Sequence, residues 1–348
     1  KVPSIGYPKC MICVGTEGYA SRADYPSPES MRTNPLKLKE EPWRFQYSPY
    51  AYYPEHCIVL NEQHTPMSIS RRTFELLLSF TAQFPHYFVG SNADLPIVGG
   101  SILSHDHFQG GSHLFPMDRA PVYAELAHPE YSDIEIGAVR WPMTCLRLVG
   151  SNTARLASLA EKILQAWRTY DDEEHDILHA TNEEAHSTIT PIARRHEDGR
   201  YILQLVFRNN RTTEEHPLGL FHPHADLHHI KCENSGLIEV MGRFIFPGRL
   251  LTELNAFLPA LMGVPMDQPA EHDPLAKHYG WIQDVIKAYG TASTETEAVT
   301  LLRKAVGEKC IRVLEDAGVF KDTEDGRSAF FQFLQTVGIA KHQVACPC

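Results

Sequence analysis

The sequence predicts a protein of the α+β class, because strand-like and helix-like patterns occupy different parts of the chain. Residues 187–195 and 201–208 both read as strands, and Asp198-Gly199 lies in the connection between them, which predicts an antiparallel hairpin. Amphipathic runs over 72–83 and 153–170 predict helices. Beyond residue 250 the pattern is almost wholly helical. Antiparallel strands with helices gathered elsewhere in the chain are typical of the α+β class.

The remaining elements follow from the same patterns. Strands are predicted at 51–60, 86–89, 97–108, 141–149 and 237–246, and helices at 250–261, 274–289, 295–317 and 329–337. The predicted helix over 153–170 places Leu156, Leu159 and Ile163 on one face, with Asn152 as its N-cap.

Composition excludes several classes of protein. The 348 residues are 43% hydrophobic and 22% charged, which indicates a globular chain with a substantial core. The formal charge of −11 and the absence of a Lys/Arg-rich run argue against a nucleic-acid or membrane surface. No apolar run approaches the roughly 20 residues that cross a bilayer. We therefore expect a cytoplasmic protein, and the initial Lys1 suggests that a longer chain has lost its beginning.

The most informative segment is 92–111, which contains Gly99-Gly100-Ser101 and His105-Asp106-His107-Phe108-Gln109. If residues 101–109 are extended, His105, His107 and Gln109 share one face and the intervening side chains point the other way. A structural polar stripe and a metal-binding His-x-His pair are alternatives. Gln109 favours phosphate, since glutamine is a poor metal ligand but a good donor to an anion, and the Gly-Gly-Ser run adds further donors.

The lack of positive charge near this segment narrows how it could bind phosphate. From Thr73 to Asp118, 46 residues, there is no Lys or Arg. A phosphate bound by this segment must therefore meet neutral donors and imidazole. A neutral imidazole can attack phosphorus and form a phosphoramidate, which divides one transfer into two steps. Its other ring nitrogen must donate a hydrogen bond that fixes the tautomer.

These residues resemble the active-site motif of the galactose-1-phosphate uridylyltransferases, a transferase branch of the histidine-triad superfamily. The segments around 91–111, 207–212 and 221–231 are similar to the second class of that family, found in Gram-positive bacteria, and the likeness runs from Cys10 to about Leu250. The resemblance implies an α+β fold of two histidine-triad-like halves, each a mostly antiparallel sheet with packed helices. We expect the first half at 1–138 and the second, with its helical C-terminal part, at 139–348.

The resemblance also implies an activity, the transfer of UMP from UDP-glucose to galactose 1-phosphate. His107 would become uridylylated, with its other nitrogen held by a backbone carbonyl near His105, and Gln109 would contact the transferred phosphoryl group. The implied substrate-binding residues are Asn92, Gly99, Gly100 and Ser101. The implied partners are UDP-glucose, UDP-galactose, sugar 1-phosphates and a second copy in a homodimer.

A metal is implied as well. Cys10 and Cys13 form a C-x2-C pair, and the resemblance implies a structural zinc site completed by His56 and His105. His64 competes with His56 for the same position. Eight cysteines are too few for a disulfide scaffold, and reduced core thiols are the alternative to a metal.

A second histidine-rich segment contains His222, His224, His228 and His229. His222-Pro-His224 lies 117 positions after His105-Asp-His107, which suggests a diverged duplication, although coincidence in a His-rich chain is the alternative. A hydrogen-bonded histidine cluster is favoured over a second metal site. Arg208, Arg211 and Lys231 are the nearest cations, and either contribute charge to a sugar phosphate or are solvated.

Two other functions stay open on the sequence. One is another histidine-triad nucleotidyltransferase, such as a dinucleoside polyphosphate phosphorylase, which assays with the two substrate sets would separate. The other is a nucleotide-sensing protein without turnover. An intact His107 argues against the second.

Overall fold

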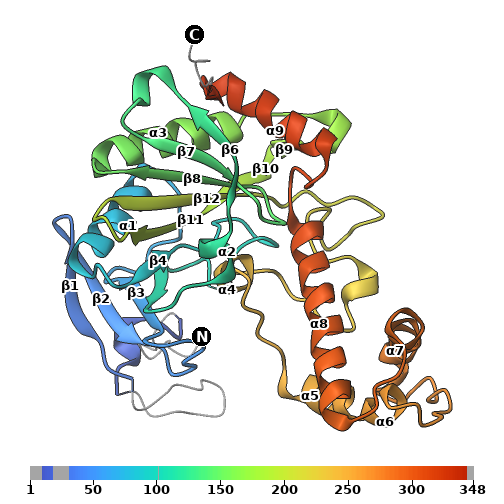
Figure 1. The fold of residues 1–348 in the computed structure, drawn as a ribbon. Coiled ribbons are helices and arrows are strands. Elements are labelled where there is room, and N and C mark those ends of the chain that lie inside the picture. Colours follow the sequence, from blue (N-terminus) through green and yellow to red (C-terminus); the bar gives the residue numbers. More distant parts are fainter. Residues whose placement is uncertain (1–9, 19–30, 101, 343–348) are drawn as a thin grey trace.

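The computed structural model describes residues 10–18, 31–100 and 102–342, and its centre is one eleven-stranded antiparallel sheet (Figure 1). The strands of this sheet are β1 (Asn34–Leu38), β2 (Glu41–Tyr47), β3 (Cys57–Asn61), β4 (Phe88–Gly90), β5 (His107–Gly111), β6 (Val122–Ala127), β7 (Glu135–Val139), β8 (Cys145–Gly150), β11 (Ser187–Arg195), β12 (Tyr201–Asn209) and β13 (Ala340–Lys341). A separate small ribbon pairs β9 (Ala180–Thr181) with β10 (Glu184–Ala185).

Helices complete the mixed architecture. The α-helices are α1 (Arg71–Gln83), α2 (Pro116–Arg119), α3 (Thr153–Trp167), α4 (Leu237–Val240), α5 (Gly248–Asn255), α6 (Leu258–Leu261), α7 (Ala276–Tyr289), α8 (Glu295–Ala317) and α9 (Glu324–Val337). Short 3-10 turns are η1 (Val14–Thr16), η2 (Pro129–Tyr131), η3 (Glu173–His175) and η4 (Ala225–Leu227). The predicted α+β class is confirmed.

The main core lies between one face of the sheet and α1, α3 and α9. Leu156, Leu159 and Ile163 of α3 are fully buried there, as their helical spacing predicts. The predicted cap is also present, since the Oδ1 atom of Asn152 accepts from the backbone N–H of Ala154 (3.1 Å) and of Arg155 (3.2 Å).

The opposite face of the sheet packs against α2, α4 and the C-terminal end of α8 in a second core cluster. The N-terminal half of α8 belongs to a third cluster with α5, α6 and α7. Figure 1 shows α8 as the long orange-red helix that runs between these two regions. Within the described residues, no helix is both long and apolar enough to cross a membrane.

The strand order is the same on both sides of the β4–β11 pair. Outward from that pair it runs β4, β5, β3, β2, β1 on one side and β11, β12, β8, β7, β6 on the other. Along the chain, α1 follows β3, the third strand of the first set, and α3 follows β8, the third strand of the second set. This arrangement is compatible with two related halves, although the two halves share one continuous sheet.

The same order bears on the expected boundary and on the two histidine motifs. The boundary at 138/139 falls at the end of β7, whereas strand order groups β6 and β7 with the second half, so the division stays a prediction. The counterpart of β5 is β12, which ends at Asn209. His222-Pro-His224 therefore does not occupy the position equivalent to His105-Asp-His107.

Four predicted strands are wrong in extent or type, and two of them, predicted at 51–60 and 141–149, begin only at Cys57 and Cys145. The strand predicted at 97–108 begins only at His107, because residues before it bond to the loop after β3: Met67 N–H donates to the Leu103 carbonyl and Asp106 N–H to the Thr65 carbonyl. The strand predicted at 237–246 is instead the short helix α4 followed by loop. Its first turn is capped, because Gly236 N–H donates to the Glu239 carboxylate at 3.1 Å.

Candidate active site

β5 presents the motif to a cavity of about 740 Å³. His107 and Gln109 both line this cavity, whereas Phe108 between them is buried in the core and stacks on Trp43 with ring centroids 4.7 Å apart. This alternation is the one that an extended backbone predicts. The prediction that His105 shares this face is wrong, because His105 precedes the strand and its Nδ1 atom lies 3.3 Å from Cys10 Sγ instead.

His107 has the arrangement expected of a nucleophile. Its Nδ1 lies 2.7 Å from the carbonyl oxygen of His105, so Nδ1–H donates to that carbonyl and Nε2 keeps its lone pair. The predicted hydrogen bond is therefore present. Burial lowers the pKa of His107, while the same hydrogen bond acts in the opposite direction. The neutral imidazole, the form that can attack an electrophile, is the favoured one.

The expected phosphate-side residues lie in the same cavity wall. Asn92, Gly99 and Gly100 all line it, while Ser101 lies outside the described residues. The Oδ1 atom of Asn92 accepts from Leu237 N–H at 2.8 Å, which fixes the amide at the start of α4. A Cβ atom at Gly100 would come within 2.6 Å of Asn92 Nδ2, so the close contact between the Gly100 backbone and the Asn92 amide requires glycine.

The second half of the chain supplies the rest of the wall, which the motif alone did not reveal. The additional lining residues are Tyr52 from the first half and, from the second, Lys231, Glu233, Asn234, Gly236, Leu237, Ile238, Glu239, Ile245, Phe246 and Pro247. Lys231 is 6% exposed and lies 3.4 Å from Glu233 and 3.6 Å from Glu239. A buried cation thus faces the segment that contains no Lys or Arg of its own.

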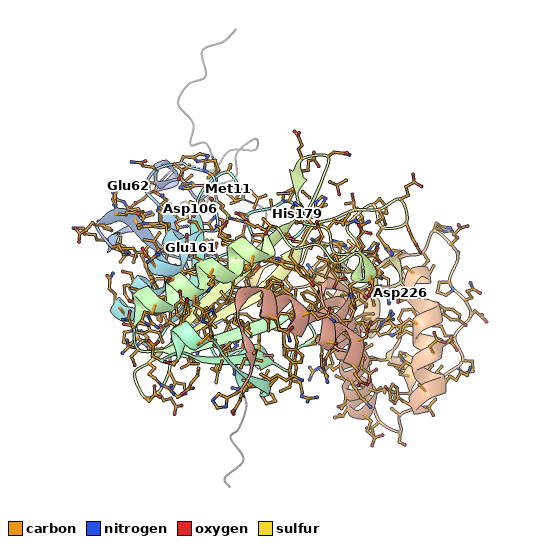
Figure 2. The ribbon with its side chains drawn as sticks, turned by 90° about the horizontal axis from the view of Figure 1, so that it is seen from above. Met11, Glu62, Asp106, Glu161, His179 and Asp226 are labelled. Carbon is orange, nitrogen blue, oxygen red and sulfur yellow. The ribbon has the colours of Figure 1, made fainter. Side chains whose placement is uncertain are left out.

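A cluster that could hold a metal ion lies next to the motif. It comprises Cys10, Cys13, His64 and His105, with all four ligand atoms within 4.8 Å of one another. Cys10 Sγ is 3.3 Å from His105 Nδ1, and Cys13 Sγ is 3.1 Å from His64 Nδ1. Figure 2 shows Met11, Glu62 and Asp106, neighbours of these ligands in sequence, at the same end of the molecule.

The sequence predicted His56 as the fourth member of this cluster, but the structure places His64 there. His56 and His64 lie at opposite ends of β3, and only the His64 end reaches the cysteine pair. His56 instead lies with its Nε2 atom 3.3 Å from Gln109 Oε1. Burial lowers the pKa of His56. The spacing that favoured His56 was therefore misleading.

The second histidine-rich segment is hydrogen-bonded, as the sequence favoured. His222 Nε2 lies 3.2 Å from Asn234 Oδ1, His228 Nε2 lies 2.8 Å from the Pro223 carbonyl, and His229 Nδ1 lies 2.9 Å from His278 Nδ1. Among the residues that the structure describes, the cysteine–histidine cluster above is the one group arranged to hold a metal ion.

We expect His229 to make the protein less stable in acid. Burial, with Lys309 and His278 nearby, lowers the pKa of His229 to about 4, so below the ordinary histidine value the unfolded chain binds the proton more readily. Its contribution to the free energy of unfolding is fully present above that value and is lost as pH falls towards 4. The fall in melting temperature between neutral pH and about pH 5 should be smaller in His229→Asn than in the unsubstituted chain. An equal fall in both proteins would contradict this.

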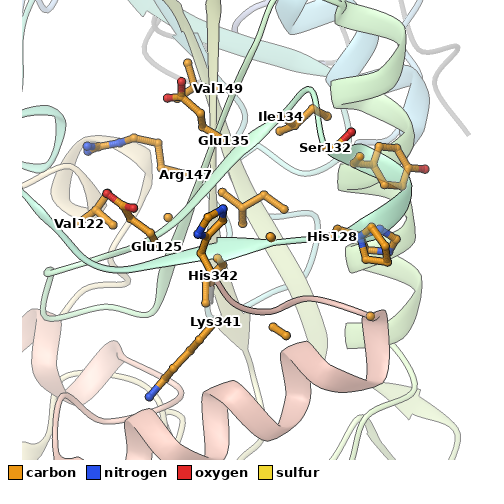
Figure 3. Close-up of a pocket in the computed structure, with 18 residues that line it drawn as sticks. Val122, Glu125, His128, Ser132, Ile134, Glu135, Arg147, Val149, Lys341 and His342 are labelled. Carbon is orange, nitrogen blue, oxygen red and sulfur yellow. The ribbon is translucent and has the colours of Figure 1, made fainter. Parts of the chain in front are cut away.

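A larger cavity, of about 980 Å³, lies elsewhere, beside β6, β7, β8 and β13 (Figure 3). Glu125, Glu135, Arg147 and His342 are among its lining residues, so charges of both signs face it. It does not include His107 or Gln109. The chemistry of the residues, rather than cavity size, therefore identifies the candidate site.

Comparison with known proteins agrees with this geometry. Residues 80–258 match the family model described as galactose-1-phosphate uridyl transferase, C-terminal domain, a range that includes β5 and both walls of the cavity apart from Tyr52. No solved structure gives a match.

Curated relatives that match this chain carry the name galactose-1-phosphate uridylyltransferase. The protein from Caldanaerobacter subterraneus subsp. tengcongensis is 49% identical over 98% of this chain and 67% of its own length. The proteins from Clostridium acetobutylicum and Bacillus subtilis are 49% and 48% identical over 95% of this chain, and 66% and 64% of their own lengths. The chain thus spans about two thirds of the length of these relatives. It belongs to the galactose-1-phosphate uridylyltransferase family of nucleotidyltransferases.

Proposed function

We propose that this chain transfers UMP from UDP-glucose to galactose 1-phosphate through a uridylyl group carried on His107. The observation that supports this most strongly is the buried His107, whose Nδ1–H is committed to the His105 carbonyl at 2.7 Å and whose ring lines the same cavity as Gln109. That geometry leaves a single nitrogen, Nε2, available for bond formation.

In the first step, the Nε2 lone pair of His107 attacks the α-phosphorus of UDP-glucose, and the bond from phosphorus to the bridging oxygen breaks. Glucose 1-phosphate leaves with the electron pair of that bond. In the second step a phosphate oxygen of galactose 1-phosphate attacks the same phosphorus, and His107 leaves as neutral imidazole. The leaving group of the first step is already stable as an anion, so the site requires no general acid, which agrees with Gln rather than His at position 109.

Gln109 and the glycine segment act on the transferred phosphoryl group in this proposal. The Gln109 amide N–H donates to a non-bridging oxygen as negative charge builds on it, and backbone N–H groups near Gly99 and Gly100 add donors. Close approach of the phosphate is possible because neither glycine has a side chain.

We further propose that the cluster of Cys10, Cys13, His64 and His105 binds zinc. Zn–S bonds of about 2.3 Å and Zn–N bonds of about 2.0–2.1 Å, arranged tetrahedrally, separate ligand atoms by roughly 3.3–3.8 Å. The five separations that involve a cysteine sulfur run from 3.1 Å to 3.7 Å, and the His64–His105 separation is within 4.8 Å. His105 Nε2 is 2.8 Å from the Asn61 carbonyl, so Nε2–H donates there and Nδ1 is left to bind metal.

With four protein ligands, such a zinc ion is structural rather than catalytic. It would tie the segment around η1 to the residue two positions before the nucleophile. Since the carbonyl of His105 holds His107 Nδ1, the same residue orients both the metal cluster and the nucleophile.

Lys231 is expected to contribute to phosphate binding. Among the described residues that line the cavity it is the one Lys or Arg, and burial strengthens its interaction with an anion. Lys231→Met should raise KM for galactose 1-phosphate by about 10-fold or more with a smaller change in kcat. The exposed Lys304→Met is the matched control. Equal KM values for the two variants would remove Lys231 from the phosphate site.

The proposed function is tested by isotope exchange. The chain is incubated with UDP-glucose and labelled glucose 1-phosphate without galactose 1-phosphate. Label should enter UDP-glucose, because the first half-reaction is complete in itself, and steady-state kinetics should be ping-pong. Direct transfer between two bound substrates gives no such exchange. A chain that turns over both substrates yet shows no exchange would contradict the covalent route.

The homodimer remains a prediction of the resemblance, and the cytoplasmic location remains a prediction from composition and the lack of a long apolar run. Sedimentation of the purified chain measures the first directly, and a monomer at assay concentrations would contradict it.

A further inference from the structure

We propose that His56 is a positioning residue, which holds the side-chain amide of Gln109 so that its NH₂ group, rather than its oxygen, faces the bound phosphoryl group. This inference rests on the proposed function, and it assigns His56 a role other than metal binding. It follows from three features of the described residues around the imidazole ring.

The first feature is the contact itself. His56 is 4% exposed, and its Nε2 atom lies 3.3 Å from the Oε1 atom of Gln109. Gln109 shares the cavity face of β5 with His107. His56 does not itself line the cavity, but it contacts two residues that do: Gln109 through this hydrogen bond and Tyr52 through ring stacking.

The second feature is the other ring nitrogen. His56 Nδ1 is buried and has no hydrogen-bond partner among the described residues. A neutral imidazole carries its proton on one nitrogen only. A proton on Nδ1 would leave a buried donor without an acceptor, whereas a proton on Nε2 makes a hydrogen bond to Gln109. The favoured tautomer therefore has Nε2–H as the donor and Gln109 Oε1 as the acceptor.

The third feature is the support for the ring. Tyr52 stacks on His56 with ring centroids 5.5 Å apart and planes 23° apart, and Tyr53 packs at 4.4 Å and 41°. Tyr53 is itself buried, at 4% exposure. Two aromatic neighbours limit rotation of the imidazole, so the donor keeps a fixed direction.

The consequence is an amide whose orientation is set before substrate binds. With Oε1 held by His56, the two N–H groups of Gln109 are left for the cavity. The reversed amide would present a carbonyl oxygen to a phosphoryl oxygen and would repel it. A donor fixed in advance needs no reorganisation as charge develops on the phosphoryl group.

The chain offers a matched pair of variants. In His56→Gln the amide nitrogen reaches about as far as Nε2, and in His56→Asn it reaches only as far as Nδ1. The measurement is the single-turnover rate at which UDP-glucose uridylylates the chain. We expect His56→Asn to be slower by about 10-fold and His56→Gln to stay within about 3-fold of the unsubstituted chain. Melting temperatures of both variants show whether the fold is kept.

The second arm places both substitutions in a Gln109→Ala background. If His56 acts through Gln109, neither substitution slows Gln109→Ala further. A further 10-fold loss in that background, or equal rates for His56→Asn and His56→Gln, would overturn the inference while leaving the proposed function intact. Failure of the unsubstituted chain to become uridylylated would instead overturn the proposed function and, with it, this role.

Discussion

His107→Ala is expected to lose uridylyl transfer by at least about 10⁴-fold, because the substitution removes the atom that forms the bond to phosphorus. The side chain is buried at the cavity wall. The measurement is the rate of UDP-galactose formation from UDP-glucose and galactose 1-phosphate. Near-normal turnover by His107→Ala would end the proposed mechanism.

Gln109→Ala is the matched control for this loss. It sits two residues along the same face of β5 and lines the same cavity, but it contributes a hydrogen bond rather than the reacting atom. We expect it to become uridylylated slowly, about 10²–10³-fold below the unsubstituted chain. Complete loss in both variants, with both folded, would remove the distinction between nucleophile and donor.

His64→Ala is expected to abolish metal binding, whereas His56→Ala is expected to retain it. The cluster of ligand atoms includes His64 and excludes His56, which contacts Gln109 instead. Metal analysis of unchelated protein should find about one zinc per chain in the unsubstituted protein and in His56→Ala, and almost none in His64→Ala. Structural zinc contributes folding free energy, so His64→Ala should also melt at a lower temperature.

The opposite result, zinc lost in His56→Ala and kept in His64→Ala, would contradict the observed cluster and restore the ligand set that spacing suggested. Zinc absent from the unsubstituted protein would remove the metal proposal but not the nucleophile, because the His105 carbonyl holds His107 without it.

The sequence correctly predicted helices and strands that have a long periodic hydrophobic pattern or a capping residue at one end. The helix at 295–317 coincides with α8, and α3 begins after the Asn152 cap. The hairpin of β11 and β12 also follows the alternating pattern. In each case local periodicity and burial require the same structure, so the local pattern is sufficient.

Predictions failed where long-range contacts decide the structure. Residues 102–106 look like the start of a strand, but their partners lie in the loop after β3, which no local pattern reveals. The run Leu237-Ile-Glu-Val is too short for periodicity to separate helix from strand. A Gly236-x-x-Glu239 cap was the available signal, and its contact with Asn92 was not visible in the sequence.

The residues of the candidate site also fall into those that a local sequence pattern predicts and those that only the folded chain brings together. His107 and Gln109 could be found because both belong to one short motif with a strict alternation. The fourth member of the cysteine–histidine cluster could not be chosen by spacing, since β3 separates His56 from His64 and places them at opposite ends of the strand. The sequence named Lys231 as a nearby cation, but its position in the cavity depends on how the second half folds over the first.

The central claim, a covalent uridylyl group on His107, is tested most directly by mass spectrometry of the chain after incubation with UDP-glucose alone. The account predicts that the intact protein gains the mass of one uridylyl group, that this mass lies on the peptide containing His107, and that it is discharged by galactose 1-phosphate. His107→Ala should show no gain. A chain that converts both substrates while carrying no adduct, or carrying it on another residue, would contradict the account.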